Sequence, residues 1–298
     1  MTHPITVATT DDSSARNKVP SSISQVGIIS KYELLNYFRS RRFFVLLAIS
    51  GAIAGVLTAV VAYYGVATFG STSLEFYSRW WGFSATYVII FCAIFFGGDS
   101  ISGEFQNKTG YFLVGNPLRR SSIYVGKWIA ALTASLIIIG FFTAITLGNG
   151  IYYFGADVPY QFGESILFCL VYLIAILGFT FFFSSLFKSS SMSILVTAIL
   201  LLFGFNIISA LVTNIAHAEP WFLLTYGAEI IGNVLTNPYP QHETTVTSPF
   251  GPGGGPGGNH VSFTQYNATV PEGLTIMAIY FIATAVLGLL LFERKDFN

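Results

Sequence analysis

The chain has 298 residues, of which 53% are hydrophobic and only 9% charged, and its mean hydropathy is +0.65. Soluble domains carry about a quarter charged residues, so this composition excludes a soluble protein and predicts a surface that mostly faces lipid. The net charge is zero, with 14 basic and 14 acidic residues, which excludes a nucleic-acid binder with its basic surplus. Cys92 and Cys169 lie inside apolar runs, which is typical of buried small hydrophobes and not of a disulfide or a metal site.

The N-terminal part of the chain divides into two segments. Residues 1–21 are polar and lack the apolar stretch of a cleavable signal peptide, so we expect a disordered cytoplasmic tail. In residues 22–42, Ile29, Tyr32 and Leu35 recur at three- and four-residue spacing among basic side chains. This pattern predicts an amphipathic helix lying in the membrane interface. A simple basic flank to the first span is the alternative, but it does not explain the apolar stripe.

The rest of the chain, within a domain of residues 22–298, is predicted to cross the membrane with α-helices. A bilayer core of about 30 Å requires roughly 20 apolar helical residues, and backbone groups in lipid must pair within each span. Six segments meet this demand and contain no Lys, Arg, Asp, Glu or His. They are Phe43–Tyr64, Trp80–Phe96, Trp128–Tyr153, Ile166–Phe187, Met192–Ile215 and Leu274–Phe292. The fold class is therefore an all-α membrane protein with six transmembrane helices.

The basic residues predict the orientation of these spans. With six spans, all of the 14 basic residues except Arg79 fall on the side of the two termini. The positive-inside rule assigns this side to the cytoplasm, so we expect a multi-pass protein of the cytoplasmic membrane with both termini inside. The basic residues on this side are Arg16, Lys18, Lys31, Arg39, Arg41, Arg42, Lys108, Arg119, Arg120, Lys127, Lys188, Arg294 and Lys295.

The long external loop, residues 216–272, contains no Lys or Arg. Within it, residues 220–235 are apolar enough for a helix on or in the outer leaflet. Residues 248–259 are rich in Gly and Pro and offer no side chains for a core, so they predict a flexible loop. Asn267 begins an Asn-Ala-Thr glycosylation sequon on the outer side, which is a short and weakly specific motif.

Motifs for chemistry on this chain are scarce. Three histidines of the outer loop match no zinc spacing, so solvated side chains are expected and no metal site is predicted: His217, His242 and His260. Gly126-Lys127 is followed by Trp128 and lacks the upstream Gly of a phosphate-binding loop, so we expect no nucleotide binding and no enzymatic activity here. Asn206, within the fifth span, either bonds neighbouring helices or lines a translocation path.

The segment between the second and third spans, residues 97–128, contains an unusual combination of signals. Glu104–Val114 is predicted to form a short helix that Gly115 ends, with Asn116 and Pro117 starting the next helix. Aromatic residues, including Phe105, are available for packing. A short helix held off the membrane suits docking to another protein, whereas an ordinary charged loop would need neither the capping signals nor the aromatic residues.

This segment resembles the permease subunits of type-2 ABC exporters. The resemblance rests on Asp99, Ile101 and Glu104 at the end of the second span and on a run leading into the third: Gly110, Leu113, Pro117, Arg120, Ile123, Gly126 and Lys127. Thr109 precedes Gly110, whereas in the family it follows. The interfacial helix, the outer helix and the closing residues 292–297 are also similar.

The resemblance implies that residues 97–128 contain a cytoplasmic coupling helix that contacts a separate ABC ATPase. Glu104, Gly110, Pro117, Arg120 and Lys127 are then the ATPase-coupling residues. ATP and Mg²⁺ would bind to the partner, with no cofactor on this chain, and the permease would form a homodimer or a heterodimer with a second permease. The implied function is ATP-driven export of an unidentified substrate. The alternative is a non-transporting scaffold or assembly factor of the same architecture.

Overall fold

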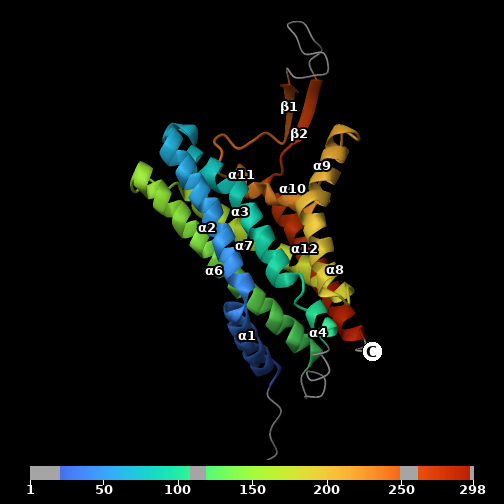
Figure 1. The fold of residues 1–298 in the computed structure, drawn as a ribbon. Coiled ribbons are helices and arrows are strands. Elements are labelled where there is room, and N and C mark those ends of the chain that lie inside the picture. The colour runs from blue at the N-terminus through green and yellow to red at the C-terminus, as the bar shows by residue number, and fades with distance from the viewer. Residues whose placement is uncertain (1–20, 108–118, 249–260, 296–298) are drawn as a thin grey trace, which may run out of the picture.

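The computed structural model describes residues 21–107, 119–248 and 261–295, and these residues are mainly helical (Figure 1). Six of the described helical segments are long and apolar enough to cross a membrane, which confirms the six predicted spans and the all-α class. The long helices are α2 (Arg41–Tyr64), α3 (Ser73–Gly97), α6 (Arg120–Phe154), α7 (Tyr160–Leu186), α8 (Ser190–Ile199) with α9 (Phe205–Asn214), and α12 (Val270–Arg294).

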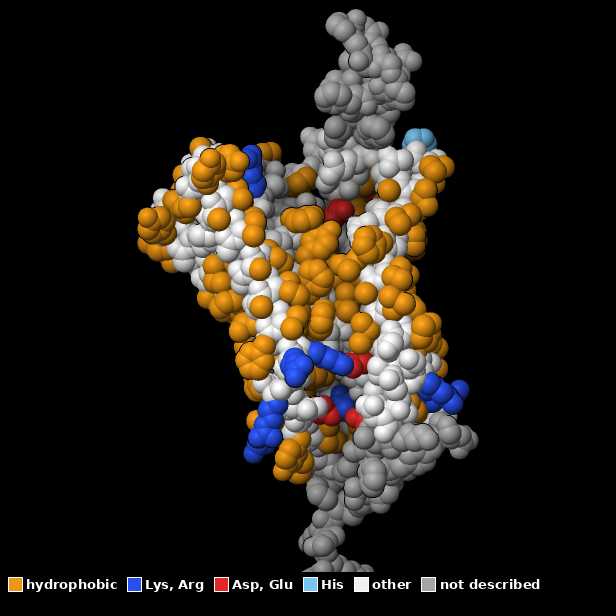
Figure 2. Space-filling model, in the orientation of Figure 1, with side chains coloured by type: hydrophobic (Ala, Val, Ile, Leu, Met, Phe, Trp, Pro, Cys, Tyr) orange, Lys and Arg blue, Asp and Glu red, His pale blue; other side chains and the backbone are white. Residues whose placement is uncertain are grey.

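The spans pack around α7 and α3. Helix α12 lies along α7, while α3 contacts both α6 and α7. The core is richest in aromatic side chains where these helices meet, and Trp81 stacks on Phe142 and meets Phe162 edge-on. The Trp81 indole donates to Ser165 Oγ at 3.0 Å, which satisfies its one polar atom. Figure 2 shows the apolar middle of the molecule, with most of the visible Lys and Arg side chains gathered toward one end.

We call this end, which contains α1 (Ser22–Arg39) and α4 (Ser102–Gln106), the α1 end, and the opposite end the hairpin end (Figure 1). Helix α1 packs along α6, and Gly126 permits this contact because an added Cβ would lie 2.8 Å from an Ile29 methyl carbon. The predicted α1 helix is therefore present. Its apolar residues divide, however: Ile29 faces α6, while Tyr32 and Leu35 are exposed. Its position in a membrane interface remains a prediction.

The fifth span is not a continuous α-helix. One π-helical turn, Leu200–Gly204, separates α8 from α9. Such turns contain one more residue than an α-helical turn. Below it, Ser193 Oγ donates to Gly98 O at 2.5 Å, and above it α9 contacts the outer elements of the chain.

At the hairpin end, two features differ from the prediction. Residues 220–235 form two short helices, α10 (Leu224–Ala228) and α11 (Ile230–Asn233), that are buried against α3, α7 and α12 and do not form one lipid-facing helix. Gly82 and Gly232 allow the close contact, since a Cβ at Gly82 would lie 3.1 Å from Gly232 Cα.

The second difference is an antiparallel hairpin of β1 (Glu243–Ser248) and β2 (Val261–Tyr266). The sequence did not predict these strands. They flank most of the Gly-rich segment, of which residues 249–259 lie outside the described part of the chain.

Candidate functional site

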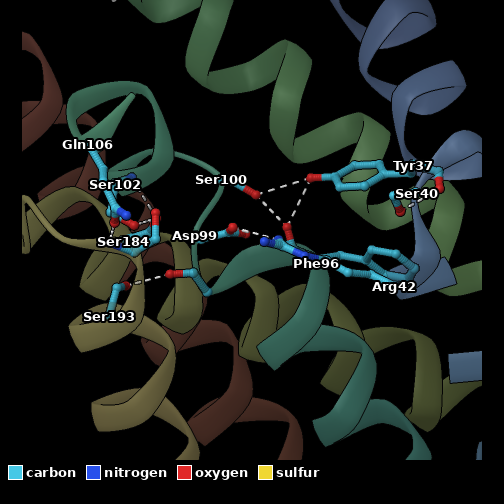
Figure 3. A network of polar contacts seen from close by, with 12 residues as sticks. Tyr37, Ser40, Arg42, Phe96, Asp99, Ser100, Ser102, Gln106, Ser184 and Ser193 are labelled. Carbon is cyan, nitrogen blue, oxygen red and sulfur yellow. Dashed lines mark hydrogen bonds and ion pairs between the residues drawn. The ribbon is translucent and has the colours of Figure 1, made fainter. Parts of the chain in front are cut away.

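The junction between α3 and α4 is attached to the fourth and fifth spans by hydrogen bonds (Figure 3). The backbone N–H groups of Ile101 and Ser102 donate to Ser184 Oγ of α7 at 2.9 and 3.0 Å. At the other end of α4, the Gln106 side-chain oxygen accepts from Ser190 N at 2.7 Å, at the start of α8. Helix α4 is only five residues long, so these bonds, more than its own turns, determine its position.

A buried ion cluster joins α4 to α1 and α6. Lys127 of α6 forms ion pairs with Glu33 of α1 and with Glu104 of α4, the latter at 2.7 Å. The Lys127 side chain is only 6% exposed, while Glu33 and Glu104 are 21% and 16% exposed. The two carboxylates around the ammonium group compensate the free-energy cost of removing it from water. A buried charged lysine without such partners would be strongly destabilising.

Beside this cluster, the ends of α1, α2 and α3 are joined. Arg42 of α2 pairs with Asp99 at 2.5 Å, and the Tyr37 hydroxyl donates to Phe96 O at 2.9 Å (Figure 3). Ser100 Oγ lies 3.1 Å from the same hydroxyl. Burial raises the pKa of Tyr37 to about 12, so this phenol stays protonated and remains a hydrogen-bond donor at physiological pH. Several of these residues and the ion cluster line a cavity of about 330 Å³.

The last described residue, Lys295, joins α12 to α4 and α7. Its Nζ donates to the carbonyls of Ser185 and Phe187 at 2.8 Å each and lies 4.4 Å from the centre of the Phe105 ring. A cation at these carbonyls satisfies the unpaired C-terminal acceptors of α7. Burial and the neighbouring Lys188 lower the pKa of Lys295 to about 8. Phe105 also packs edge-on against Phe292, so the packing role expected for Phe105 is confirmed.

The start of α6 differs from the prediction. The helix begins at Arg120, with Arg119 as its N-cap, and not at Asn116 and Pro117. The Arg119 backbone is extended, and its N–H donates to the Gln25 side chain of α1 at 3.2 Å. This bond attaches the start of α6 to α1. The Arg120 guanidinium donates to Glu293 O at 2.8 Å and to Lys295 O at 3.0 Å, at the end of α12.

Three of the five coupling residues expected from the sequence thus lie in the described structure. Glu104 and Lys127 form a direct ion pair, whereas Arg120 binds the end of α12. Gly110 and Pro117 lie outside the described residues. Lys127 is buried, so its contribution is to hold α4 and α1 together and not to present a surface to a partner.

Glu33 and Lys295 were not predicted as members of this site. Glu33 lies four residues after Ile29 and four before Tyr37, so all three share one face of α1. A carboxylate on that face was the available signal for a buried cation opposite it.

A second cavity, of about 350 Å³, lies toward the hairpin end and is lined by residues of α3, α9, α10, α11 and β2. Asn206 lines this cavity, and its amide donates to Leu202 O at 3.0 Å. Glu229 lies in the same wall. Its side chain is accessible from the cavity, but the surrounding protein limits its solvation and raises its pKa to about 7, against a backbone hydrogen bond from Ala268 that acts in the opposite direction.

Asn267, the predicted glycosylation residue, is 7% exposed, and its amide donates to Gln241 O at 2.8 Å. The hydroxyl residue of the sequon, Thr269, caps α12 in a capping box with Glu272. In the folded chain the amide nitrogen is thus already bonded, and its glycosylation remains an untested prediction.

The family comparison agrees with this architecture. A comparison with curated proteins gives no match. The family model described as "ABC-2 family transporter protein" matches residues 28–297, which include all six spans and the cluster around Lys127. The chain is therefore a multi-pass membrane protein that belongs to the ABC-2 family of transporters and has a permease-type role.

Proposed function

We propose that the chain is the membrane-spanning subunit of an ATP-driven exporter in the cytoplasmic membrane, and that a separate ABC ATPase binds ATP and Mg²⁺ and supplies the energy. The ATPase docks at the α1 end, on the segment that follows α4. Glu104, Gly110, Pro117, Arg120 and Lys127 belong to the region that forms or supports this contact. The unknown substrate moves from the cytoplasm outward.

The observation that carries this proposal is the set of contacts around α4. Its residues reach α6 through Glu104, α7 through Ser102, α8 through Gln106 and α12 through Phe105. Helix α1 is reached indirectly, because Lys127, the partner of Glu104, also pairs with Glu33. A displacement of α4 therefore acts directly on the third to sixth spans. An ordinary loop between two spans would transmit force only to those two spans.

These contacts suit a switch between two arrangements of the spans. ATP-driven closure of a partner can bias a permease only if the partner binds the two arrangements with different affinity. Packed interfaces of this kind shift as units between discrete positions. The ion cluster at Lys127 keeps α1, α4 and α6 together during such a shift, because separating its charges in a buried site is costly.

The orientation is supported by charge. With six spans, the sequence predicts that all of the 14 basic residues except Arg79 fall on the side of the chain termini, and an excess of Lys and Arg is typical of cytoplasmic loops. This orientation would leave the hairpin end outside the cell and the α1 end accessible to an ATPase in the cytoplasm.

The cavity between α3 and α9 is our candidate for part of the translocation path, with Asn206 and Glu229 as its polar wall. We propose that a second permease, identical or similar, pairs with this chain across an exposed apolar face of the fifth span. This face includes Phe203 of the π-helical turn and Ile207 and Leu211 of α9. For the homodimer, Ile207→Cys should give a disulfide-linked dimer on oxidation of native membranes. The exposed Val56→Cys on α2 serves as the control.

The decisive experiment is purification of the tagged full-length chain from its native membranes in mild detergent. An ABC ATPase should copurify in equal amount and hydrolyse ATP. Glu104→Arg, which puts like charge beside Lys127, and Gly110→Trp should each lower ATP hydrolysis by the complex at least tenfold. Glu243→Gln, an exposed change at the hairpin end, should leave hydrolysis unchanged.

Two results would refute the proposal. One is purification of the folded chain without any ATPase. The other is unchanged complex formation, hydrolysis and transport in both Glu104→Arg and Gly110→Trp. Either result would favour a scaffold that does not couple ATP hydrolysis to transport.

A further inference from the structure

Three side chains that are distant in the sequence meet at the hairpin end. Glu219 follows α9, His242 precedes β1, and Glu272 lies in the first turn of α12. One ring nitrogen of His242 and one oxygen from each glutamate lie within 4.8 Å of one another. His242 Nε2 is 3.4 Å from Glu219 Oε2, and its Nδ1 is 3.7 Å from Glu272 Oε2.

Each of the three side chains is oriented by a further hydrogen bond. The Tyr226 hydroxyl donates to Glu219 Oε1 at 2.8 Å, and Thr269 N donates to Glu272 Oε2 at 2.9 Å. His242 Nδ1 lies 3.1 Å from the carbonyl oxygen of Asn267. When Nδ1 carries the ring proton and donates it to this carbonyl, the lone pair of Nε2 points toward Glu219. This arrangement is typical of a histidine that binds a metal.

The charges of the outer segment also point to a cation. Residues 216–272 contain four glutamates and no Lys or Arg. In the described structure, the ion-pair partner of both Glu219 and Glu272 is His242. A bound divalent cation would compensate the charges of these two carboxylates.

We propose that Glu219, His242 and Glu272 bind a divalent transition-metal ion of the Zn²⁺ class, with a water molecule as a further ligand. Imidazole with two carboxylates suits zinc better than Mg²⁺ or Ca²⁺, which prefer all-oxygen sites. Ligand atoms around tetrahedral zinc are about 3.3 Å apart, close to the 3.4 Å between His242 and Glu219. The Glu272 side chain is 40% exposed, so it can rotate to become the third protein ligand of the ion.

Such an ion would link the outer segment to the start of the last span. It would join the chain after α9, the base of the hairpin and the first turn of α12, which are otherwise held by hydrogen bonds such as that from Asn267 N to His242 O at 2.8 Å. The proposed metal is thus structural, and its role does not depend on the transport function proposed above. The proposed ligands come from three separate segments and follow no short motif, so the sequence alone does not predict this site.

Calorimetric titration of the full-length chain, purified in detergent and freed of metal with EDTA, tests the proposal. ZnCl₂ should bind saturably with one ion per chain, and an excess of MgCl₂ should not displace it. His242→Ala, Glu219→Gln and Glu272→Gln should each weaken Zn²⁺ binding at least tenfold. Glutamine at position 272 still fits the capping box of α12, so this variant removes a ligand charge while keeping the helix start.

His217→Ala and Glu243→Gln are the matched controls, because both residues are exposed and lie in the same outer segment. Both should bind Zn²⁺ as the unchanged chain does, and Zn²⁺ should raise their Tm equally. The proposal is overturned if the unchanged chain shows no saturable Zn²⁺ binding. It is also overturned if Glu272→Gln, together with whichever of His242→Ala and Glu219→Gln folds, binds Zn²⁺ as tightly as the unchanged chain. Equal competition by Mg²⁺ would also overturn it.

Discussion

Replacing Lys127 by Met tests the buried ion cluster at the α1 end. The substitution keeps the length of the side chain but leaves Glu33 and Glu104 facing each other at 21% and 16% exposure. Removing one partner from a buried ion pair costs about 3–5 kcal/mol. Because both glutamates keep some contact with water, we expect the lower end of this range, about 3 kcal/mol.

This loss can be converted into an unfolding temperature. An unfolding entropy of roughly 2 cal/mol/K per residue over 298 residues gives a Tm lowered by about 5 °C for Lys127→Met. Thermal unfolding of the purified chain in detergent, followed by circular dichroism, measures the change. Lys31→Met, an exposed lysine on α1, is the matched control and should change the free energy of unfolding by less than about 0.5 kcal/mol.

A triple variant separates the unpaired charges from simple loss of packing. Lys127→Met combined with Glu33→Gln and Glu104→Gln removes all three charges, and neutral replacement of a whole buried cluster is often close to neutral in stability. We expect it to recover most of the lost Tm. If Lys127→Met has the same Tm as Lys31→Met, or if the triple variant is less stable than the single one, the reasoning about charge burial is wrong.

Three further predictions concern helix packing, pH and capping. Gly126→Val should separate α1 from α6, because a Cβ there lies 2.8 Å from Ile29, and should lower the free energy of unfolding by about 1–3 kcal/mol. The same change in an Ile29→Ala background should lower it less. An equal loss of Tm in both backgrounds would contradict the steric explanation. Glu229 has its pKa raised from 4.5 to about 7, so it stabilises the fold fully below pH 4.5, and this contribution is lost as the pH rises to 7. The Tm of Glu229→Gln should therefore fall less between pH 4.5 and 7 than that of Glu243→Gln. If the Tm of both variants changes with pH in parallel, the raised pKa of Glu229 is refuted. Lys295→Met should leave the last carbonyls of α7 without their cation and lower stability by about 1–2 kcal/mol; faster hydrogen exchange confined to the end of α7 would identify the cause, and unchanged exchange would exclude a capping role.

The spans were predictable because crossing a lipid bilayer requires a helix of sufficient length with apolar side chains, and both properties can be read from the sequence alone. A segment such as Phe43–Tyr64 needs only length and apolar side chains to be identified, and α2 covers it. The pair of Glu104 and Lys127 was also within reach, since the two residues flank the connection between successive spans.

Other features depend on contacts between distant segments and were missed. The hairpin strands contain several Thr residues and are separated by a Gly-rich segment much longer than the usual two- to five-residue turn. Helices α10 and α11 are apolar for the same reason that a lipid-facing helix is apolar, so composition could not distinguish burial in protein from burial in lipid. The role of Lys295 depends on where α7 ends in space, which its own neighbours in the sequence do not encode.

The π-helical turn at Leu200–Gly204 changes the directions in which side chains point in α9 relative to those in α8. One extra residue in a turn rotates everything beyond it by about 100° around the helix axis. Because of this offset, Ser193 can face Gly98 while Asn206, more than three turns further along, faces the cavity between α3 and α9. A chain shortened by one residue within this turn would keep its hydropathy and its length as a span, yet it would point Asn206 away from the cavity.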